Sequence, residues 1–353
     1  MDTYRIDVDI PLEETVRREN KLADPALSPR PLSARPSISV VAPAYNEQEV
    51  LPEFYLRVTK VLAATGMPYE IVLVNDGSCD QTLALMHQLR GNDPHLTVVD
   101  LSRNFGKEIA LTAGLDHTYG DIIVILDADL QDPPELIPQM LEGWYEGYDV
   151  VYGVRTHRDG ESLTKKATAK LFYRLIQHVS RVRIPKDTGD FRLMTRRAVE
   201  ELRKLREEHR FMKGLFAWIG FPAKPMYYRR DARVAGNTKW NYAGLWNLAM
   251  EGITSFTVAP LKVASYTGFA VALTAMLYGI YVIWKAMFFG NPVKGYPSLM
   301  AVILFLGGIQ LMSIGILGEY IGRIFHEVKG RPLYLVNRLL QSSLQEKEIG
   351  RPE

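Results

Sequence analysis

The chain has 353 residues, with 42 lysines and arginines against 40 aspartates and glutamates, and a formal net charge of +2. This length allows about two domains, and the near-neutral balance argues against a surface that neutralises many phosphates, so no nucleic acid partner is expected. A single cysteine, Cys79, excludes an intramolecular disulfide framework and a cysteine-rich zinc site.

Residues 1–36 are rich in charge and punctuated by proline, which predicts an extension outside the folded domain. The first 20 residues contain no apolar core of a signal peptide. The domain that follows is therefore expected in the cytoplasm.

From residue 37, short runs of Val, Ile and Leu alternate with helical patterns. The apolar runs predict strands at 38–42, 70–74, 96–101, 121–126 and 149–154. The intervening patterns predict helices at 48–64, 80–90, 107–118 and 134–146. Because strands and helices alternate, we predict an α/β fold with a mostly parallel sheet and helices on both faces.

Beyond the fifth strand the pattern is less regular. A basic helix is predicted at 162–180, an extended segment at 191–194 and a helix at 196–207. The apolar, tryptophan-containing stretch at 242–257 is typical of an interfacial helix that lies along a membrane surface.

Two stretches near the C-terminus, 263–284 and 295–318, contain no charged residue. Each exceeds the about 20 residues that cross a bilayer core as a helix. We therefore predict a transmembrane hairpin, the alternative being an apolar helix pair in a soluble oligomer. Lysine and arginine gather outside the two stretches rather than between them, which predicts a multi-pass protein of the inner membrane with both termini in the cytoplasm.

These patterns divide the chain into an extension at 1–36, an α/β domain at 37–235, a juxtamembrane loop and interfacial helix at 236–260, two transmembrane helices at 261–325 and a cytoplasmic tail at 326–353. Glycines in the second apolar stretch, at positions 307, 308, 315 and 318, allow close helix packing and predict a homo-oligomer. The alternative is that membrane helices simply tolerate glycine.

Polar clusters follow all five predicted strands, at 43–47, 75–78, 102–107, 127–132 and 153–155. Ligands of open α/β sheets bind at these strand ends. Asp127 and Asp129, spaced i, i+2, can converge on a hard cation, and Gln131 adds a carbonyl oxygen. Oxygen ligands suit Mg²⁺ or Mn²⁺, which also bridge diphosphates. The alternative is an Asx turn that precedes a helix.

The other strand ends carry candidates for contacts with a nucleotide. The carboxylate of Asp76 can accept a hydrogen bond from a base N–H or a ribose hydroxyl, or the segment can be a turn in which Ser78 or Asp80 caps the next helix. Arg103 and Lys107 are candidates to face phosphates, the alternative being that they are solvated surface charges.

Together these residues resemble glycosyltransferase family 2, whose fold is GT-A. The resemblance lies in PAYNE (43–47), NDGS (75–78), DAD with the following LQDPPE (127–135) and GDFRLM (189–194). SRNFGKE (102–108), FMKG (211–214), AGNTKW (235–240) and GILGEYIGR (315–323) further resemble polyprenyl-phosphate glycosyltransferases, in particular the bactoprenol glucosyltransferases. The resemblance covers about residues 37–335.

The resemblance implies roles for individual residues. The nucleotide sugar is expected against Pro43, Tyr45, Glu47, Asp76, Asp127, Thr238 and Lys239, and the metal ion against Asp127, Asp129 and Gln131. The acceptor phosphate is expected against Arg155 and one or more of Lys165, Lys166 and Lys170. The residues expected to act in catalysis are Asp129, Asp190, Arg155 and Arg233.

The reaction that the resemblance implies moves glucose from UDP-glucose to undecaprenyl phosphate, with Mg²⁺ or Mn²⁺ as cofactor and inversion at the anomeric carbon. Mannose, galactose or an aminoarabinose derivative are alternative donor sugars. A degenerate accessory subunit of a lipid-sugar flippase is the alternative from another class of protein. A processive synthase is disfavoured because QxxRW is missing, and a dinucleotide oxidoreductase because GxGxxG is missing after the first strand.

Overall fold

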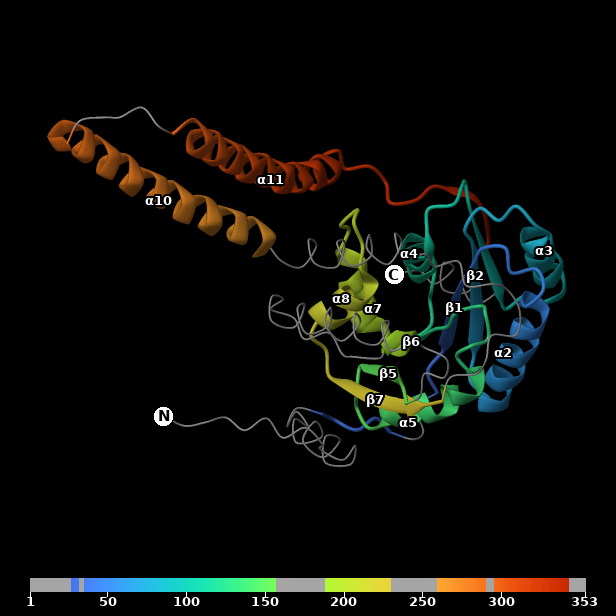
Figure 1. Cartoon of the computed structure of the whole chain (residues 1–353). Coiled ribbons are helices and arrows are strands. Elements are labelled where there is room, and N and C mark those ends of the chain that lie inside the picture. Colours follow the sequence, from blue (N-terminus) through green and yellow to red (C-terminus); the bar gives the residue numbers. More distant parts are fainter. Residues whose placement is uncertain (1–26, 32–34, 157–187, 230–258, 290–294, 343–353) are drawn as a thin grey trace.

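The computed structural model describes residues 27–31, 35–156, 188–229, 259–289 and 295–342. These residues form a sheet covered by helices and a helical hairpin that extends away from it (Figure 1). The predicted basic helix at 162–180 and the predicted interfacial helix at 242–257 lie outside the described residues.

Within the described residues, eight strands form one sheet in the order β7-β5-β6-β4-β1-β2-β3-β8. Their bounds are β1 Ile38–Ala44, β2 Tyr69–Asn75, β3 Leu96–Leu101, β4 Ile122–Ile125, β5 Val150–Arg155, β6 Thr188–Thr195, β7 Ala223–Tyr228 and β8 Val336–Leu340. Strands β4, β1, β2 and β3 are parallel neighbours, and β5 is parallel to β7. Strand β6 is antiparallel to β4 and β5, and β8 is antiparallel to β3. The predicted α/β fold with a mostly parallel sheet is confirmed.

Two helical layers cover the sheet. Strand side chains alternate between them, so that Val40 and Leu73 belong to one cluster whereas Val41 and Val74 belong to the other. One cluster includes side chains from α2 (Leu51–Thr65), α3 (Thr82–Asn92) and α5 (Ile137–Tyr145, preceded by a 3₁₀ turn at Pro134–Leu136). The other includes side chains from α4 (Lys107–Asp116), α7 (Arg196–Lys204) and α8 (Met212–Trp218).

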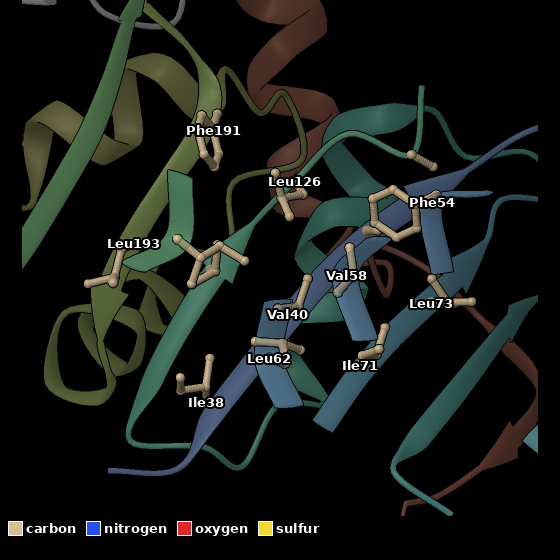
Figure 2. Close-up of a cluster of buried hydrophobic side chains, with 14 of the residues drawn as sticks. Ile38, Val40, Phe54, Val58, Leu62, Ile71, Leu73, Leu126, Phe191 and Leu193 are labelled. Carbon is tan, nitrogen blue, oxygen red and sulfur yellow. The ribbon is translucent and has the colours of Figure 1, made fainter. Parts of the chain in front are cut away.

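The first cluster packs helix α2 tightly against the sheet that carries the strand ends. Figure 2 shows Phe54, Val58 and Leu62 of α2 directed at Val40 and Ile71 of the sheet. These side chains are at most 1% exposed. Burying each such side chain contributes about 1.5–3 kcal/mol, so the sheet and its covering helices stabilise one another.

The C-terminal hairpin consists of α10 (Ala259–Phe289) and α11 (Tyr296–Val328), which lie side by side and extend away from the sheet (Figure 1). Within the described residues, one segment is long and apolar enough to cross a membrane, namely Phe305–Val328 of α11. This segment overlaps the predicted second span at 295–318. A shorter apolar segment, Ala264–Tyr278, lies in α10. A crossing by α10 therefore stays a prediction.

After α11 the chain returns to the sheet. The backbone N–H of Ser102 donates to Leu335 (2.9 Å), and β8 then pairs with β3. The hydroxyl of Tyr334 donates to Asp116 (2.8 Å), and that of Ser342 donates to the buried Glu70 (2.9 Å). Part of the segment that the sequence pattern assigns to a tail is thus the edge of the sheet, and it ties α11 to the α/β domain.

Candidate active site

The loops after β1 and β2 are bonded to each other, and this contact fixes one side of the site. Asn46, with φ of 55°, accepts a hydrogen bond from the N–H of Cys79 (2.8 Å), and its own N–H donates to Ser78 (3.0 Å). The N–H of Glu47 donates to Thr82 (2.9 Å). Pro43, Tyr45 and Glu47, which are the predicted nucleotide contacts, are half-buried at this strand end.

Asp76 anchors the loop after β3. Its two carboxylate oxygens accept hydrogen bonds from the N–H groups of Phe105 (2.7 Å) and Gly106 (3.1 Å). Burial raises the pKa of Asp76, and these two donors counteract the rise. Gly77 has a φ of 65°, and a Cβ there would overlap the backbone of the same loop. The predicted nucleotide contact is therefore also a structural residue.

Arg103 and Lys107 from this loop have different surroundings. The exposed guanidinium of Arg103 lies over the ring of Phe105, 4.0 Å from its centre. The ammonium of Lys107 lies 2.7 Å from Asp127 after β4 and 2.7 Å from Asp190 on β6. Lys107 thus joins two carboxylates that the sequence predicts as site residues, and its side chain stays 47% exposed.

The charges of these three groups depend on one another. Burial alone would raise the pKa of Asp190, but the ammonium groups of Lys107 and Lys213 hold it well below its usual range. The pKa of Asp127 is raised by burial and, although Lys107 acts in the opposite direction, by the nearby carboxylates of Asp190 and Asp129. The site therefore concentrates negative charge around Asp127.

The segment after β4 has the geometry of an Asx turn. The Oδ1 atom of Asp129 accepts from the N–H of Gln131 (3.2 Å), and Leu130 between them has a φ of 58°. A buried leucine rarely adopts this conformation. Such backbone strain concentrates at functional sites, so the turn and the predicted ligand role of this segment are compatible.

Arg155 is held at the other side of the acidic cluster. Its Nε atom donates to the hydroxyl of Tyr228 on β7 (3.3 Å), and that hydroxyl donates in turn to Asp132. The Nη2 atom of Arg155 lies 3.6 Å from Asp132. The predicted phosphate-binding arginine is thus oriented by two residues for which the sequence indicated no role.

A second row of side chains supports Asp190. The buried guanidinium of Arg192 donates to the backbone oxygens of Asp190 (3.2 Å) and Gly189 (2.9 Å), and lies 3.4 Å from the centre of the Phe216 ring. Burial lowers the pKa of Arg192 to about 10. Glu108 and Lys213 also interact electrostatically with Asp190. The motifs GDFRLM and FMKG are the sequence signals for Arg192 and Lys213.

The donor chemistry of the cluster fits a divalent metal ion. The groups that surround Asp127 are the carboxylates of Asp129, Asp132 and Asp190. Oxygen-only ligands of this kind suit Mg²⁺ and Mn²⁺. The positive charge beside Asp127 is the ammonium of Lys107. In the described part of the chain, no three His, Cys, Asp or Glu side chains come together in an arrangement that could hold a metal ion.

Six predicted site residues lie outside the described residues. They are Lys165, Lys166, Lys170, Arg233, Thr238 and Lys239. Their roles stay predictions. The described residues bring together Lys107, Asp127 and Asp190, place Arg155 beside them, and keep the predicted nucleotide contacts at the ends of β1 and β2.

A twisted α/β sheet with an acidic cluster at its strand ends is the arrangement of a GT-A glycosyltransferase. Residues 39–203 match the family described as glycosyl transferase family 2, and residues 259–324 match the GtrB C-terminal hairpin. The chain belongs to glycosyltransferase family 2, and it is a glycosyltransferase.

The similarity to individual relatives spans almost their whole length. The SfII prophage-derived bactoprenol glucosyl transferase of Shigella flexneri is 48% identical over 85% of this chain and 97% of that protein. The uncharacterized glycosyltransferase sll0501 of Synechocystis is 49% identical over 86% of this chain and 95% of its own length. Among solved structures, a mannosyltransferase from Pyrobaculum calidifontis in complex with GDP-Man and Mn²⁺ is 18% identical, with a TM-score of 0.44. The match covers 86% of this chain and 94% of that chain.

Proposed function

We propose that the chain transfers glucose from UDP-glucose to the phosphate of a polyprenyl phosphate, with inversion at the anomeric carbon. The observation that carries this proposal is the similarity to the bactoprenol glucosyl transferase of Shigella flexneri, which extends over 97% of that protein. It includes both the transferase domain and the hairpin. The charges of the described site support it.

The nucleotide end of the donor fits the loops after β1 and β2. Pro43, Tyr45 and Glu47 are half-buried there and would line the pocket. Each carboxylate oxygen has two lone pairs, and each oxygen of Asp76 accepts one backbone N–H. Asp76 therefore keeps capacity to accept a further hydrogen bond from uracil or ribose.

The diphosphate end of the donor fits the acidic cluster and its cations. Asp127, Asp129 and Gln131 would hold Mg²⁺ or Mn²⁺, which when bound neutralises charge on the leaving diphosphate. Lys107 is 47% exposed and anchored only by carboxylates in the described residues. It is therefore within reach of a phosphate group while its charge balances Asp127 and Asp190.

The acceptor needs orientation more than deprotonation. A phosphate monoester has a second pKa near about 6, so its oxygen is largely ionised at neutral pH. The ammonium groups beside Asp190 hold the pKa of that carboxyl low, which makes it a weak base. We therefore assign Asp190 the role of orienting the acceptor. Attack in line with the departing diphosphate inverts the anomeric carbon.

A polyprenyl tail stays in the bilayer, so the transferase domain has to work at a membrane surface. The apolar segment Phe305–Val328 supplies one anchor by its length and composition, and α10 would supply the second. We propose that the domain lies on the cytoplasmic side of the inner membrane. We also propose that the protein forms a homo-oligomer. The molecular mass of the purified protein in detergent tests this.

The direct test is transfer from radiolabelled donors to undecaprenyl phosphate by the purified full-length protein. UDP-glucose, UDP-galactose, UDP-mannose, GDP-mannose and a UDP-aminoarabinose derivative would be compared. Label in the lipid phase from UDP-glucose, with a β-linked product by NMR, is the expected result. Label from a different donor replaces the sugar and keeps the reaction class. No lipid product from any donor, with folded protein, favours an accessory subunit of a lipid-sugar flippase instead.

A further inference from the structure

Lys213 is a half-buried lysine beside the acidic cluster. It is the second residue of α8, and the structure fixes its backbone firmly. The N–H of Met212 donates to Glu108 (3.2 Å), and the side chains of Met212 and Phe216 are at most 6% exposed. The start of the Lys213 side chain is therefore held in place by the core and by α4.

Lys213 differs from the neighbouring cations in its direct partners. Asp190 and Glu108 attract its ammonium, whereas Arg155 and Lys107 repel it. Lys107 has Asp127 and Asp190 at 2.7 Å, and Arg155 has Asp132 at 3.6 Å. Lys213, in contrast, makes no hydrogen bond and no ion pair with any residue in the part of the chain that the structure describes.

A cation in this position is unfavourable for the folded state. Burial lowers the pKa of Lys213, and two neighbouring cations add to that effect. Removing a charge from water without a direct partner costs stability. Groups perturbed in this way are common where a ligand of opposite charge binds.

The position of Lys213 in the fold indicates which anion would bind to it. The nucleotide loops follow β1 and β2, whereas Lys213 follows β6, on the far side of β4 in the sheet order. The loop before α8 touches the end of the apolar helix α11, since the N–H of Glu208 donates to Glu327 (2.8 Å). Figure 1 shows α8 on the side of the sheet from which the hairpin extends. Lys213 thus lies towards the anchor and away from the nucleotide loops.

We propose that Lys213 binds the phosphate group of the lipid acceptor beside Asp190, an assignment that rests on the proposed function. A phosphate monoester carries a charge of about −1.5 to −2 and three acceptor oxygens. It would provide Lys213 with the partner that the described residues lack. It would also screen the repulsion between Lys213 and Arg155, so that acceptor binding relieves an unfavourable arrangement of charge.

The test compares Lys213→Gln and Lys213→Arg with the wild-type protein in steady-state transfer from UDP-glucose to undecaprenyl phosphate. A hydrogen bond to a charged group is worth about 1.5–3 kcal/mol, so Lys213→Gln is expected to lower kcat/KM for the acceptor by about 10-fold to 100-fold. The KM for UDP-glucose is expected to change by less than about two-fold. Lys213→Arg keeps the charge and is expected to recover part of the loss.

Two controls separate this role from a structural one. Lys224→Gln removes a lysine that pairs with Glu146, outside the site, and is expected to leave transfer unchanged. The melting temperature of Lys213→Gln is expected to equal or exceed that of the wild type, because the substitution removes a half-buried charge that has no direct partner among the described residues.

Three results would overturn the assignment. Unchanged acceptor kinetics in Lys213→Gln would remove the lysine from the acceptor site. A selective rise in the KM for UDP-glucose would assign it to the donor diphosphate. Wild-type protein that forms no lipid product from any donor would overturn the proposed function together with this assignment.

Discussion

Gly189 on β6 and Arg155 on β5 lie so close that a Cβ atom at position 189 would overlap the Nη2 atom of the arginine. That same Nη2 atom lies 3.6 Å from Asp132, and Nε of Arg155 donates to Tyr228. The missing side chain at position 189 is what allows Arg155 to lie beside the acidic cluster.

Gly189→Ala is therefore expected to displace Arg155 without unfolding the sheet, because the three heavy atoms nearest to the added methyl group all belong to this flexible side chain. Misplacing a catalytic group by about 1 Å can cost about 100-fold in rate, so we expect transfer to fall by about 10-fold to 100-fold. Overpacking is expected to lower the free energy of unfolding by about 1–3 kcal/mol. Steady-state transfer and thermal unfolding measure the two effects.

The matched control is Gly91→Ala in α3, where a Cβ has nothing within 4 Å. This variant is expected to transfer normally and to gain up to about 1 kcal/mol of stability from helix propensity. Wild-type transfer by Gly189→Ala would show that the position of Arg155 does not matter for the reaction.

Lys107→Met is expected to move the acid limb of the pH profile to higher pH. Lys107 holds the pKa of Asp190 low, so its removal lets that pKa rise. If turnover requires ionised Asp190, activity is then lost at a higher pH as the solution is acidified. The measurement is kcat/KM between pH 5 and 8, with Lys224→Met as the control. Coincident profiles for Lys107→Met and the wild type would contradict this account of Asp190.

Much of the fold follows from local sequence. The five predicted strands occur within a few residues of their observed bounds because continuous runs such as 96–101 bury both faces. Strands β7 and β8 escape prediction because AKPMYY and VNRLL lack such a run, and their place depends on partners far away in the chain. A hydrophobic pattern carries no information about distant pairing.

The site is less predictable than the fold for a related reason. Motifs identify Asp127, Asp190 and Arg155 individually, but Lys107 contacts two of them, which lie 20 and 83 positions away from it in the chain. The motif FMKG contains Lys213 but does not indicate what the lysine does. Its importance arises from burial and from the charges that other elements bring to it.

Glu108 is expected to make stability depend on pH. Burial, reinforced by Asp190, raises the pKa of Glu108 from 4.5 to about 7. The folded state therefore binds this proton more tightly than the unfolded chain, and the contribution to stability is full below about pH 4.5 and lost as the pH rises to about 7. We expect this loss to amount to roughly 1–3 kcal/mol. Glu108→Gln cannot titrate, so its unfolding free energy should fall less than that of the wild type between pH 5 and 7.5. Equal slopes would contradict the assignment.

Cys79 offers a probe of the donor pocket that needs no turnover. It is exposed, it is the one cysteine in the chain, and its N–H donates to Asn46 in the neighbouring loop. Saturating UDP-glucose is expected to slow its alkylation by a maleimide several-fold, whereas inorganic phosphate alone should not. Cys79→Ser, which has no thiol to alkylate, is the negative control. An alkylation rate that UDP-glucose leaves unchanged would place the nucleotide elsewhere.

The most direct test of the central claim is metal-dependent transfer of labelled glucose from UDP-glucose into the lipid phase, compared between the wild type and Asp129→Ala. The account predicts transfer by the wild type with Mg²⁺ or Mn²⁺ and none with EDTA. It predicts no transfer by Asp129→Ala, although that variant still folds and enters membranes. Normal transfer by Asp129→Ala, or transfer that EDTA leaves unchanged, would contradict the proposed role of the acidic cluster.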